Sequence, residues 1–219
     1  MFYNYFLMSI FVSSIGCFLY EIIDPSIRVN NINRSQILAN YQKMLPTVTG
    51  NLVIAYPCFS IMEKNLVFDN LVFDNLIFSS DYAFVNTMLW YLYFVYYFIA
   101  WVVLTDVFFY SVHYMLHTRR LYWLHAKHHS FRYTHAVGAI YSSVFEFLVG
   151  NLTAGGLPIY ILSIPQDYVK IIIVIASVFT SAISHSGFKS VSKGHLTHHL
   201  KYKVNYGLVF LDRVVGTKN

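Results

Sequence analysis

The chain has 219 residues, of which 57% are hydrophobic, 19% aromatic and only 11% charged. Soluble domains carry roughly 25% charged residues, so this composition argues against a soluble protein and favours a membrane protein. The net charge of +5 comes without a dense basic run, which argues against nucleic-acid binding, and two cysteines in apolar segments exclude a disulfide framework.

Three apolar segments in the first half of the chain are predicted to cross a membrane. Residues 2–20 lack the basic start and the small-residue cleavage site of a secretory signal, so we interpret them as an anchor. A polar stretch, residues 21–43, follows. Residues 48–62 are shorter than the roughly 20 residues of a typical span and contain Pro57, which predicts a kinked helix. Residues 88–104 are uncharged and rich in aromatic side chains, and they form the clearest predicted span.

A tandem repeat, NLVFDNLVFDNLIF, occupies residues 65–78. A period of five residues fits neither a strand nor a helix, so we predict a duplicated loop lying against the membrane. Two more apolar segments, residues 140–162 and 168–184, follow later in the chain. The first of them contains Glu146, several glycines and Pro158, which predicts a broken or re-entrant segment rather than a straight span.

The distribution of charge predicts the orientation of these spans. Lys and Arg concentrate in residues 21–45, 113–135 and 185–219, whereas residues 63–87 hold one lysine and four acids. Alternating spans place the three basic regions on the same side of the membrane, which the positive-inside rule assigns to the cytosol. Every histidine cluster is therefore predicted to face the cytosol.

The histidines are unevenly distributed, since all ten lie after residue 112. Eight of them form three groups with helical spacing: His113 and His117; His125, His128 and His129; and His195, His198 and His199. Residues three and four apart share one face of a helix, so each group is predicted to present its imidazoles as one patch. Histidines at a membrane surface can also act as pH sensors, but clustering of this kind favours metal binding.

The number of imidazoles predicts two metal ions, because eight or more ligands exceed what one ion takes. Imidazole suits zinc, copper, iron and nickel, so spacing alone does not choose the element. A helix beginning at Met88 would cross a hydrocarbon core of roughly 30 Å by about residue 108. His113 and His117 would then lie one to two turns beyond it, at the cytosolic edge of the membrane. The predicted fold is an all-α polytopic membrane helical bundle with a histidine-rich di-metal cap.

Five ordered motifs resemble those of the fatty acid hydroxylase superfamily, which includes sterol desaturases, methyl-sterol oxidases and fatty acid hydroxylases. They are HYMLH, HAKHH, SHSG, HLTHH and NYGLVFLDRVVGT, and they cover roughly Asp106 to Thr217. The resemblance implies a membrane enzyme of the endoplasmic-reticulum type, with membrane-anchoring residues 1–105 and a catalytic domain of residues 106–219. It also implies a histidine-bound di-iron centre that uses O2 and electrons to oxidise an unactivated C–H bond of a lipid.

Carried over position by position, the resemblance implies nine metal ligands: His113, His117, His125, His128, His129, His185, His195, His198 and His199. The chain departs from the family at two places. Tyr114 stands where members commonly have an arginine, and Ser143 and Val144 stand where many have a His-Pro pair before the glutamate. One family histidine is therefore missing. His135, the tenth histidine, lies six residues after His129 and off its helix face, so we expect it to lie outside the ligand set. Replacement of the missing histidine by His135 remains an alternative.

Three acidic residues have predicted supporting roles. Asp106 shares a helix face with His113, and a carboxylate at the membrane boundary is costly unless paired, so we predict that it supports a ligand, with a structural role as the alternative. Glu146 is predicted to hold a ligand or to line the substrate path. Asp212 is predicted to form a local ion pair with Arg213 that docks the C-terminal tail.

The sequence also bears on substrate and partners. HLTHH followed by NYG resembles the sterol-modifying branches, which favours a sterol over a fatty-acyl substrate. No dinucleotide-binding glycine motif is present, so electrons must come from outside, and the resemblance implies a b-type cytochrome and its reductase. A basic tail would suit an acidic carrier or lipid headgroups: Lys189, Lys193, Lys201 and Lys203. Two other classes stay open, a non-catalytic metal-binding membrane protein and a metal transporter, although a transporter would carry histidines along several spans.

Overall fold

The computed structural model describes residues 2–65, 83–164, 167–191 and 193–219, and these residues form helices joined by short connections, with no strand among them. An isolated antiparallel bridge joins Arg28 to Phe188. The predicted all-α fold is therefore confirmed. The tandem repeat, apart from its first residue, lies outside the described residues.

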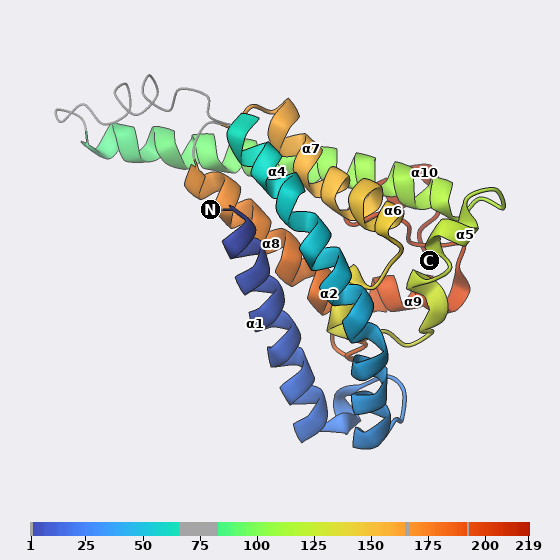
Figure 1. The fold of residues 1–219 in the computed structure, drawn as a ribbon. Helices are drawn as coiled ribbons and strands as arrows, with labels where there is room; N and C mark the ends of the chain where they lie inside the picture. The colour runs from blue at the N-terminus through green and yellow to red at the C-terminus, as the bar shows by residue number, and fades with distance from the viewer. Residues whose placement is uncertain (1, 66–82, 165–166, 192) are drawn as a thin grey trace.

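Four long helices and one composite helix build the bundle (Figure 1). The long ones are α1 (Phe2–Ile23), α2 (Arg34–Asn65), α4 (Ala83–Leu116) and α8 (Asp167–His185). The composite one runs through α6 (Val144–Glu146), the π-helix η5 (Phe147–Leu152) and α7 (Thr153–Ile161). The short elements are α5 (Tyr122–His125), α9 (Lys193–Lys201), α10 (Leu211–Val215) and the 3₁₀ turns η1 (Pro25–Ile27), η3 (His128–Ser130) and η4 (Ala136–Ile140).

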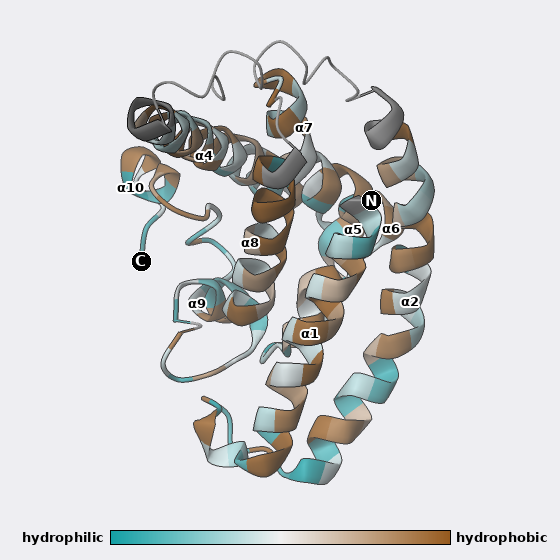
Figure 2. Cartoon of the chain, turned by 90° about the vertical axis from the view of Figure 1, so that its left-hand side faces the viewer, coloured by the Kyte–Doolittle hydropathy of each residue, from teal (hydrophilic) through white to brown (hydrophobic). Residues whose placement is uncertain are grey.

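Four segments are long and apolar enough to cross a membrane: Tyr3–Ile23, Arg34–Ile61, Thr87–Leu116 and Val144–Ile161. Helix α8 is apolar but shorter. Large apolar side chains on the outer faces are exposed, as in Phe11 (68%), Val53 (65%) and Tyr96 (63%). Hydrophobic residues predominate on α1, α7 and α8 in Figure 2. Exposed apolar surface of this extent is unfavourable in water, so these faces suit lipid and are consistent with an integral membrane protein.

The polar stretch between the first two apolar segments contains the end of one helix and the start of the next. Residues 21–23 complete α1, and α2 begins at Arg34, so a single helix contains Pro46 and Pro57. A reciprocal cap starts α2: the Asn33 side chain accepts from the Gln36 N–H, and the Gln36 side chain accepts from the Asn33 N–H, each at 3.0 Å. This capping box satisfies two N–H groups that a helix start leaves free, so the helix begins before the apolar residues do.

The segment predicted to be broken is a continuous helical run with one irregular turn. From Phe147 to Leu152 the backbone is a π-helix, and the Thr153 N–H bonds to the Leu148 carbonyl, five residues earlier. Extra residues in a helical turn shift the direction of the side chains that follow, and such turns occur often at functional sites. Here the irregular turn carries Gly150, which lies beside the Glu146 side chain.

Packing brings helices from the first and last thirds of the sequence together. Helix α1 packs along α8 and α2, and α4 packs against α7. One core cluster joins α1, α2, η4 and η5 around Phe6, Met44 and Phe147, and another joins α4, α7 and α8 around Trp101 and Ile173.

Helix α4 continues without a break through residue 106. Its 34 residues span about 50 Å, more than the roughly 30 Å of a hydrocarbon core, so its His113 end can project from the membrane.

Candidate metal centre

The structure brings all nine histidines that the family resemblance implied into two adjacent groups. The first contains His113, His117, His125, His129 and His198, and the second contains His128, His185, His195 and His199. Within each group one nitrogen per ring lies within 4.8 Å of the others, so each group can hold a metal ion. The rings come from the end of α4, from α5 and η3, from the end of α8 and from α9, which meet at one end of the bundle (Figure 1).

Regular helix geometry does not explain every group. His195, His198 and His199 lie on α9, but they do not form the predicted single patch, because His198 belongs to the first group and the other two to the second. The predicted single helix face of the middle group is wrong, because His125 ends the four-residue α5 whereas His128 and His129 form a 3₁₀ turn. The irregular backbone sends His128 to the second group, while His125 and His129 stay in the first.

The spacing of the ring nitrogens fits coordination of a metal ion. The Nε2–Nε2 distances are 3.1 Å for His117 and His129, 3.2 Å for His129 and His198. In the second group the same distance is 3.3 Å for His128 and His185, and 3.1 Å for His195 and His199. Imidazole nitrogens bound at about 2.0–2.1 Å from one ion stand roughly 2.9–3.4 Å apart. Among the described residues, the buried Nε2 atoms of His113 and His125 have no hydrogen-bond partner, as expected of atoms that face a metal.

Backbone carbonyls hold the opposite ring nitrogen of three histidines. These Nδ1 contacts are His113 to the Tyr206 carbonyl at 2.7 Å, His198 to the Val204 carbonyl at 2.8 Å, and His185 to the Ser181 carbonyl at 2.8 Å. His125 Nδ1 lies 2.8 Å from Glu146 Oε1, close enough for an ion pair but without the geometry of a hydrogen bond. An Nδ1–H group that donates to oxygen leaves Nε2 unprotonated and aims it at a metal. The three backbone carbonyls carry no side-chain signal in the sequence.

Burial keeps these imidazoles neutral. Burial, together with neighbouring histidines, lowers the pKa of His117 to about 3 and of His125 to about 2, and burial lowers the pKa of His198 to about 4. Burial also lowers the pKa of His199 well below its usual value. Neutral imidazole is the form that binds metal, so the centre is ready to coordinate at physiological pH.

A small cavity adjoins both groups. Its walls include Phe109 and Leu116 of α4, Gly150 of η5, and His113 and His185. Its volume of about 30 Å³ suits one or two waters, or a molecule of similar size. The cavity therefore has room for a small reactant but none for a lipid in this conformation.

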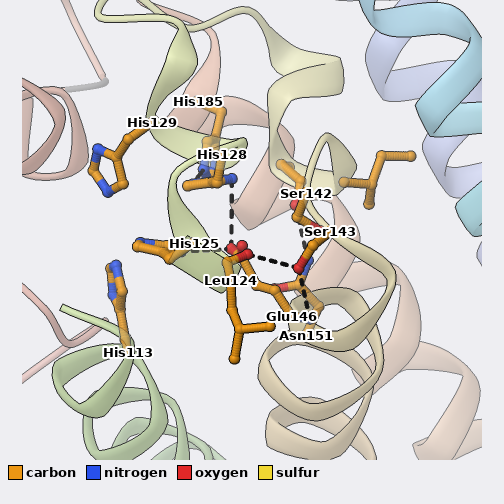
Figure 3. Close-up of polar contacts among 12 residues, drawn as sticks. His113, Leu124, His125, His128, His129, Ser142, Ser143, Glu146, Asn151 and His185 are labelled. Atoms are coloured by element: carbon orange, nitrogen blue, oxygen red, sulfur yellow. Dashed lines mark hydrogen bonds and ion pairs between the residues drawn. The ribbon is translucent and has the colours of Figure 1, made fainter. Parts of the chain in front are cut away.

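Glu146 lies in the wall of this cavity, between the histidines and the start of the composite helix (Figure 3). Its Oε1 is 2.8 Å from His125 Nδ1 and 3.8 Å from His128 Nδ1, so one carboxylate faces a histidine of each group. Ser143 caps α6 by accepting from the Glu146 N–H at 3.2 Å, and its hydroxyl donates to the Leu124 carbonyl at 2.6 Å. Ser143 thus ties the Glu146 turn to α5.

Residues 98–217, more than half of the chain, match the model of the family described as fatty acid hydroxylase. The chain belongs to the fatty acid hydroxylase family. The resemblance inferred from the five motifs is therefore confirmed, and the match includes all nine histidines of the two groups. Membership indicates a membrane protein of the lipid-hydroxylating and desaturating kind, with histidine motifs that bind metal. Neither a curated protein nor a solved structure matches the chain.

In this hydroxylase-family chain Asp106 has the structural role, which corrects the prediction that it supports a histidine. Its Oδ1 accepts from the N–H groups of Leu208 and Val209 at 2.6 and 3.1 Å, and its Oδ2 accepts from Phe210 and Leu211 at 2.8 and 2.9 Å. Four charge-assisted bonds at one buried carboxylate fasten the C-terminal segment to α4. Asp106 therefore acts on the histidines only indirectly. It fastens the segment whose Tyr206 carbonyl holds His113.

Asp212 docks the tail by a different contact from the predicted one. Its carboxylate accepts from the N–H groups of Tyr206 and Gly207 at 2.8 and 2.7 Å and from the Thr217 hydroxyl at 2.7 Å. In the described part of the chain no ion pair joins it to Arg213, so that prediction is wrong. Asp212 shapes the same loop that Asp106 fastens.

His135 lies in neither histidine group of the hydroxylase-family chain. Its Nδ1 is 2.7 Å from Glu21 Oε2 and its Nε2 is 3.0 Å from Asn40 Nδ2, so both ring nitrogens are engaged elsewhere. Nδ1 also lies 3.1 Å from Arg28 Nη1, so a carboxylate and a guanidinium meet at the same ring nitrogen. Burial lowers the pKa of His135, against the opposing effect of the Glu21 contact.

Proposed function

We propose that this chain is a membrane-bound, O2-dependent di-iron oxidoreductase that desaturates or hydroxylates a lipid C–H bond, with a sterol as the favoured substrate class. The observation that carries the proposal is the pair of buried histidine groups, five and four rings, in a member of the fatty acid hydroxylase family. Two adjacent groups suit two ions. Iron is favoured over zinc because only a metal that changes oxidation state serves oxidation of an unactivated carbon.

The nine histidines would hold the irons, and residues 106–219, which contain all nine, would form the catalytic domain, with residues 1–105 as membrane anchor. When bound, the irons would supply the oxygen-dependent removal of hydrogen from carbon. The protein's own contribution is to fix the ring orientations. The carbonyls of Tyr206, Val204 and Ser181 perform this task through Nδ1, and the Glu146 carboxylate lies beside His125 Nδ1.

The cavity supports a lipid substrate that approaches from the membrane. Phe109, Leu116 and Gly150, which line it, belong to two of the helices that are apolar enough to span a bilayer. A lipid would have to widen the space beside these residues to bring a carbon to the metals. The sterol preference rests on the resemblance of HLTHH and NYG to the sterol-modifying branches, and fatty-acyl hydroxylation at the same centre is the alternative. A non-catalytic metal-binding protein would need the two groups but no lipid access.

We further propose an endoplasmic-reticulum-type membrane location with the histidines facing the cytosol, and a b-type cytochrome with its reductase as electron donors. Orientation rests on the excess of Lys and Arg in residues 113–135 and 185–219. Four exposed lysines near the centre suit an acidic carrier: Lys189, Lys193, Lys201 and Lys203. Labelling of single cysteines introduced into these two regions reports their sidedness, and labels on opposite sides of the membrane would exclude a shared centre.

The deciding experiment combines metal analysis with a search for products. Protein purified from iron-replete cells is expected to contain two irons per chain. Cells that lack their own enzymes and express this chain are expected to form oxygenated or desaturated products from a panel of sterols and fatty acids, followed by mass spectrometry. Stoichiometric zinc without iron would overturn the oxidoreductase proposal. If the protein contains iron but forms only fatty-acyl products, the oxidoreductase proposal stands and the substrate is a fatty-acyl lipid instead of a sterol.

A further inference from the structure

A buried charged cluster lies beside the metal centre but outside it. Glu21 ends α1, Arg28 lies between α1 and α2, and His135 precedes η4, and the side chains of all three have no exposed surface. Glu21 Oε2 is 2.9 Å from Arg28 Nη1 and 2.7 Å from His135 Nδ1. Burying a guanidinium is costly unless its charge and its N–H groups are satisfied, so a fully buried arginine indicates a specific task.

Nε of Arg28 donates to the Asn30 side chain at 3.0 Å, and the two Nη groups reach the chain around His185. Nη1 donates to the Ser186 carbonyl at 2.8 Å and Nη2 donates to the Thr134 carbonyl at 2.7 Å. The hydroxyl of Thr134 in turn donates to the carbonyl of His185 itself. Arg28 thus holds the two segments that carry and flank a histidine of the second metal group.

Backbone pairing reinforces this contact. The Val29 N–H donates to the Gly187 carbonyl at 3.0 Å, and the Lys189 N–H donates to the Ile27 carbonyl at 2.9 Å. These bonds form the antiparallel bridge between the α1–α2 connection and the chain that follows α8. The end of α8, where the backbone leaves the helix, is therefore fixed by a connection more than 150 residues earlier in the sequence.

Gly187 makes room for the guanidinium. Its φ of +75° belongs to the left-handed region, and a Cβ there would lie 2.8 Å from Arg28 Nη2 and 2.9 Å from the Thr134 carbonyl oxygen. Any larger residue would be strained in its backbone and would push against Arg28. The glycine of the SHSG motif is thus required by a side chain from the N-terminal half of the chain.

We propose that Arg28 is a positioning residue for His185, and through it for the second metal group of His128, His185, His195 and His199. The inference rests on the proposed function, since it concerns the same centre. Glu21 supplies the countercharge, and His135 completes the carboxylate's bonding rather than binding metal. The membrane-anchoring half of the chain then takes part in building the metal site, because without the guanidinium the Ser186 and Thr134 carbonyls lose their donor. The backbone bonds of Val29 and Ile27 are then left to hold the chain after His185.

The test uses the full chain and a variant that leaves no unpaired charge, Glu21→Gln combined with Arg28→Met. The probe is Co(II), added to metal-free protein, because its visible absorption reports imidazole coordination whichever metal is native. Wild type is expected to bind two Co(II) ions per chain. The double variant is expected to bind one, or to release the second to a chelator at least tenfold faster, with the melting temperature of the metal-free protein close to that of wild type. Arg28→Lys is expected to rescue only partly, because an ammonium cannot reproduce the planar fork.

Arg34→Met is the matched control, because Arg34 is exposed and donates to the Ile22 and Ile23 carbonyls at the end of α1, far from the histidine groups in the sequence. Two Co(II) ions are expected to bind this variant. Two ions with wild-type release rates in the double variant would overturn the inference. So would a double variant that does not fold, because Arg28 would then be a determinant of the whole fold. A wild-type protein that binds two Co(II) ions but contains no iron when isolated would count against the proposed function while leaving the positioning role intact. Wild-type protein that binds no Co(II) would overturn both.

Discussion

Replacement of His128 or of His198 by alanine is expected to lower lipid oxidation by more than about 100-fold, because each change removes a ligand whereas loss of an orienting partner alone costs about 10–100-fold. The two residues belong to different groups, His198 to the first and His128 to the second. Each substitution is therefore expected to weaken one ion and spare the other, so that iron falls from two per chain towards one. Elemental analysis of purified variants and mass spectrometry of lipid products measure the two effects.

His135→Ala is the informative companion to these variants. Its ring contacts Glu21 and Asn40 and lies in neither group, so two irons are expected to remain although the protein loses stability. Loss of one iron in this variant would make His135 the substitute for the missing family histidine. Full activity in both His128→Ala and His198→Ala would remove the metal-centred mechanism altogether.

Asp106→Ala is expected to release the C-terminal segment from α4. The substitution leaves four N–H groups, at residues 208–211, without their acceptor. A hydrogen bond to a charged group contributes about 1.5–3 kcal/mol, so a loss of at least about 3 kcal/mol in the free energy of unfolding is expected even without additivity. Because the Tyr206 and Val204 carbonyls move with this segment, His113 and His198 lose their orienting partners, and activity should fall at least about tenfold.

Thermal unfolding and limited proteolysis of the C-terminal segment measure this effect. Asp106→Asn, which keeps one carbonyl oxygen, is expected to lie between wild type and Asp106→Ala. Asp24→Ala is a matched control on an exposed carboxylate that caps a 3₁₀ turn, and a much smaller loss of stability is expected there. Wild-type stability and activity in Asp106→Ala would show that the segment is held by other contacts.

The local order of the chain was partly readable from its residues. Apolar runs predicted where the helices lie. Asn33 and Gln36 also form a recognisable N-terminal capping pattern for α2, but it was missed because the apolar run begins later than the helix. The sequence carried no comparable signal that Asp106 would accept from backbone N–H groups instead of supporting a histidine. Residues 208–211 lie about a hundred positions away, and helix periodicity says nothing about which distant N–H groups reach a carboxylate.

The sequence by itself determined the helical class, the membrane character and the set of nine histidines, because composition, period and motif order are local properties that survive any tertiary arrangement. Only the tertiary structure decided how the nine rings divide into groups of five and four, since the 3₁₀ turn after α5 sends His128 and His129 in different directions. It also excluded His135 from both groups and placed Arg28 behind His185. The last two outcomes depend on contacts between residues more than a hundred positions apart, where burial and hydrogen bonding select one arrangement that no spacing along the chain encodes.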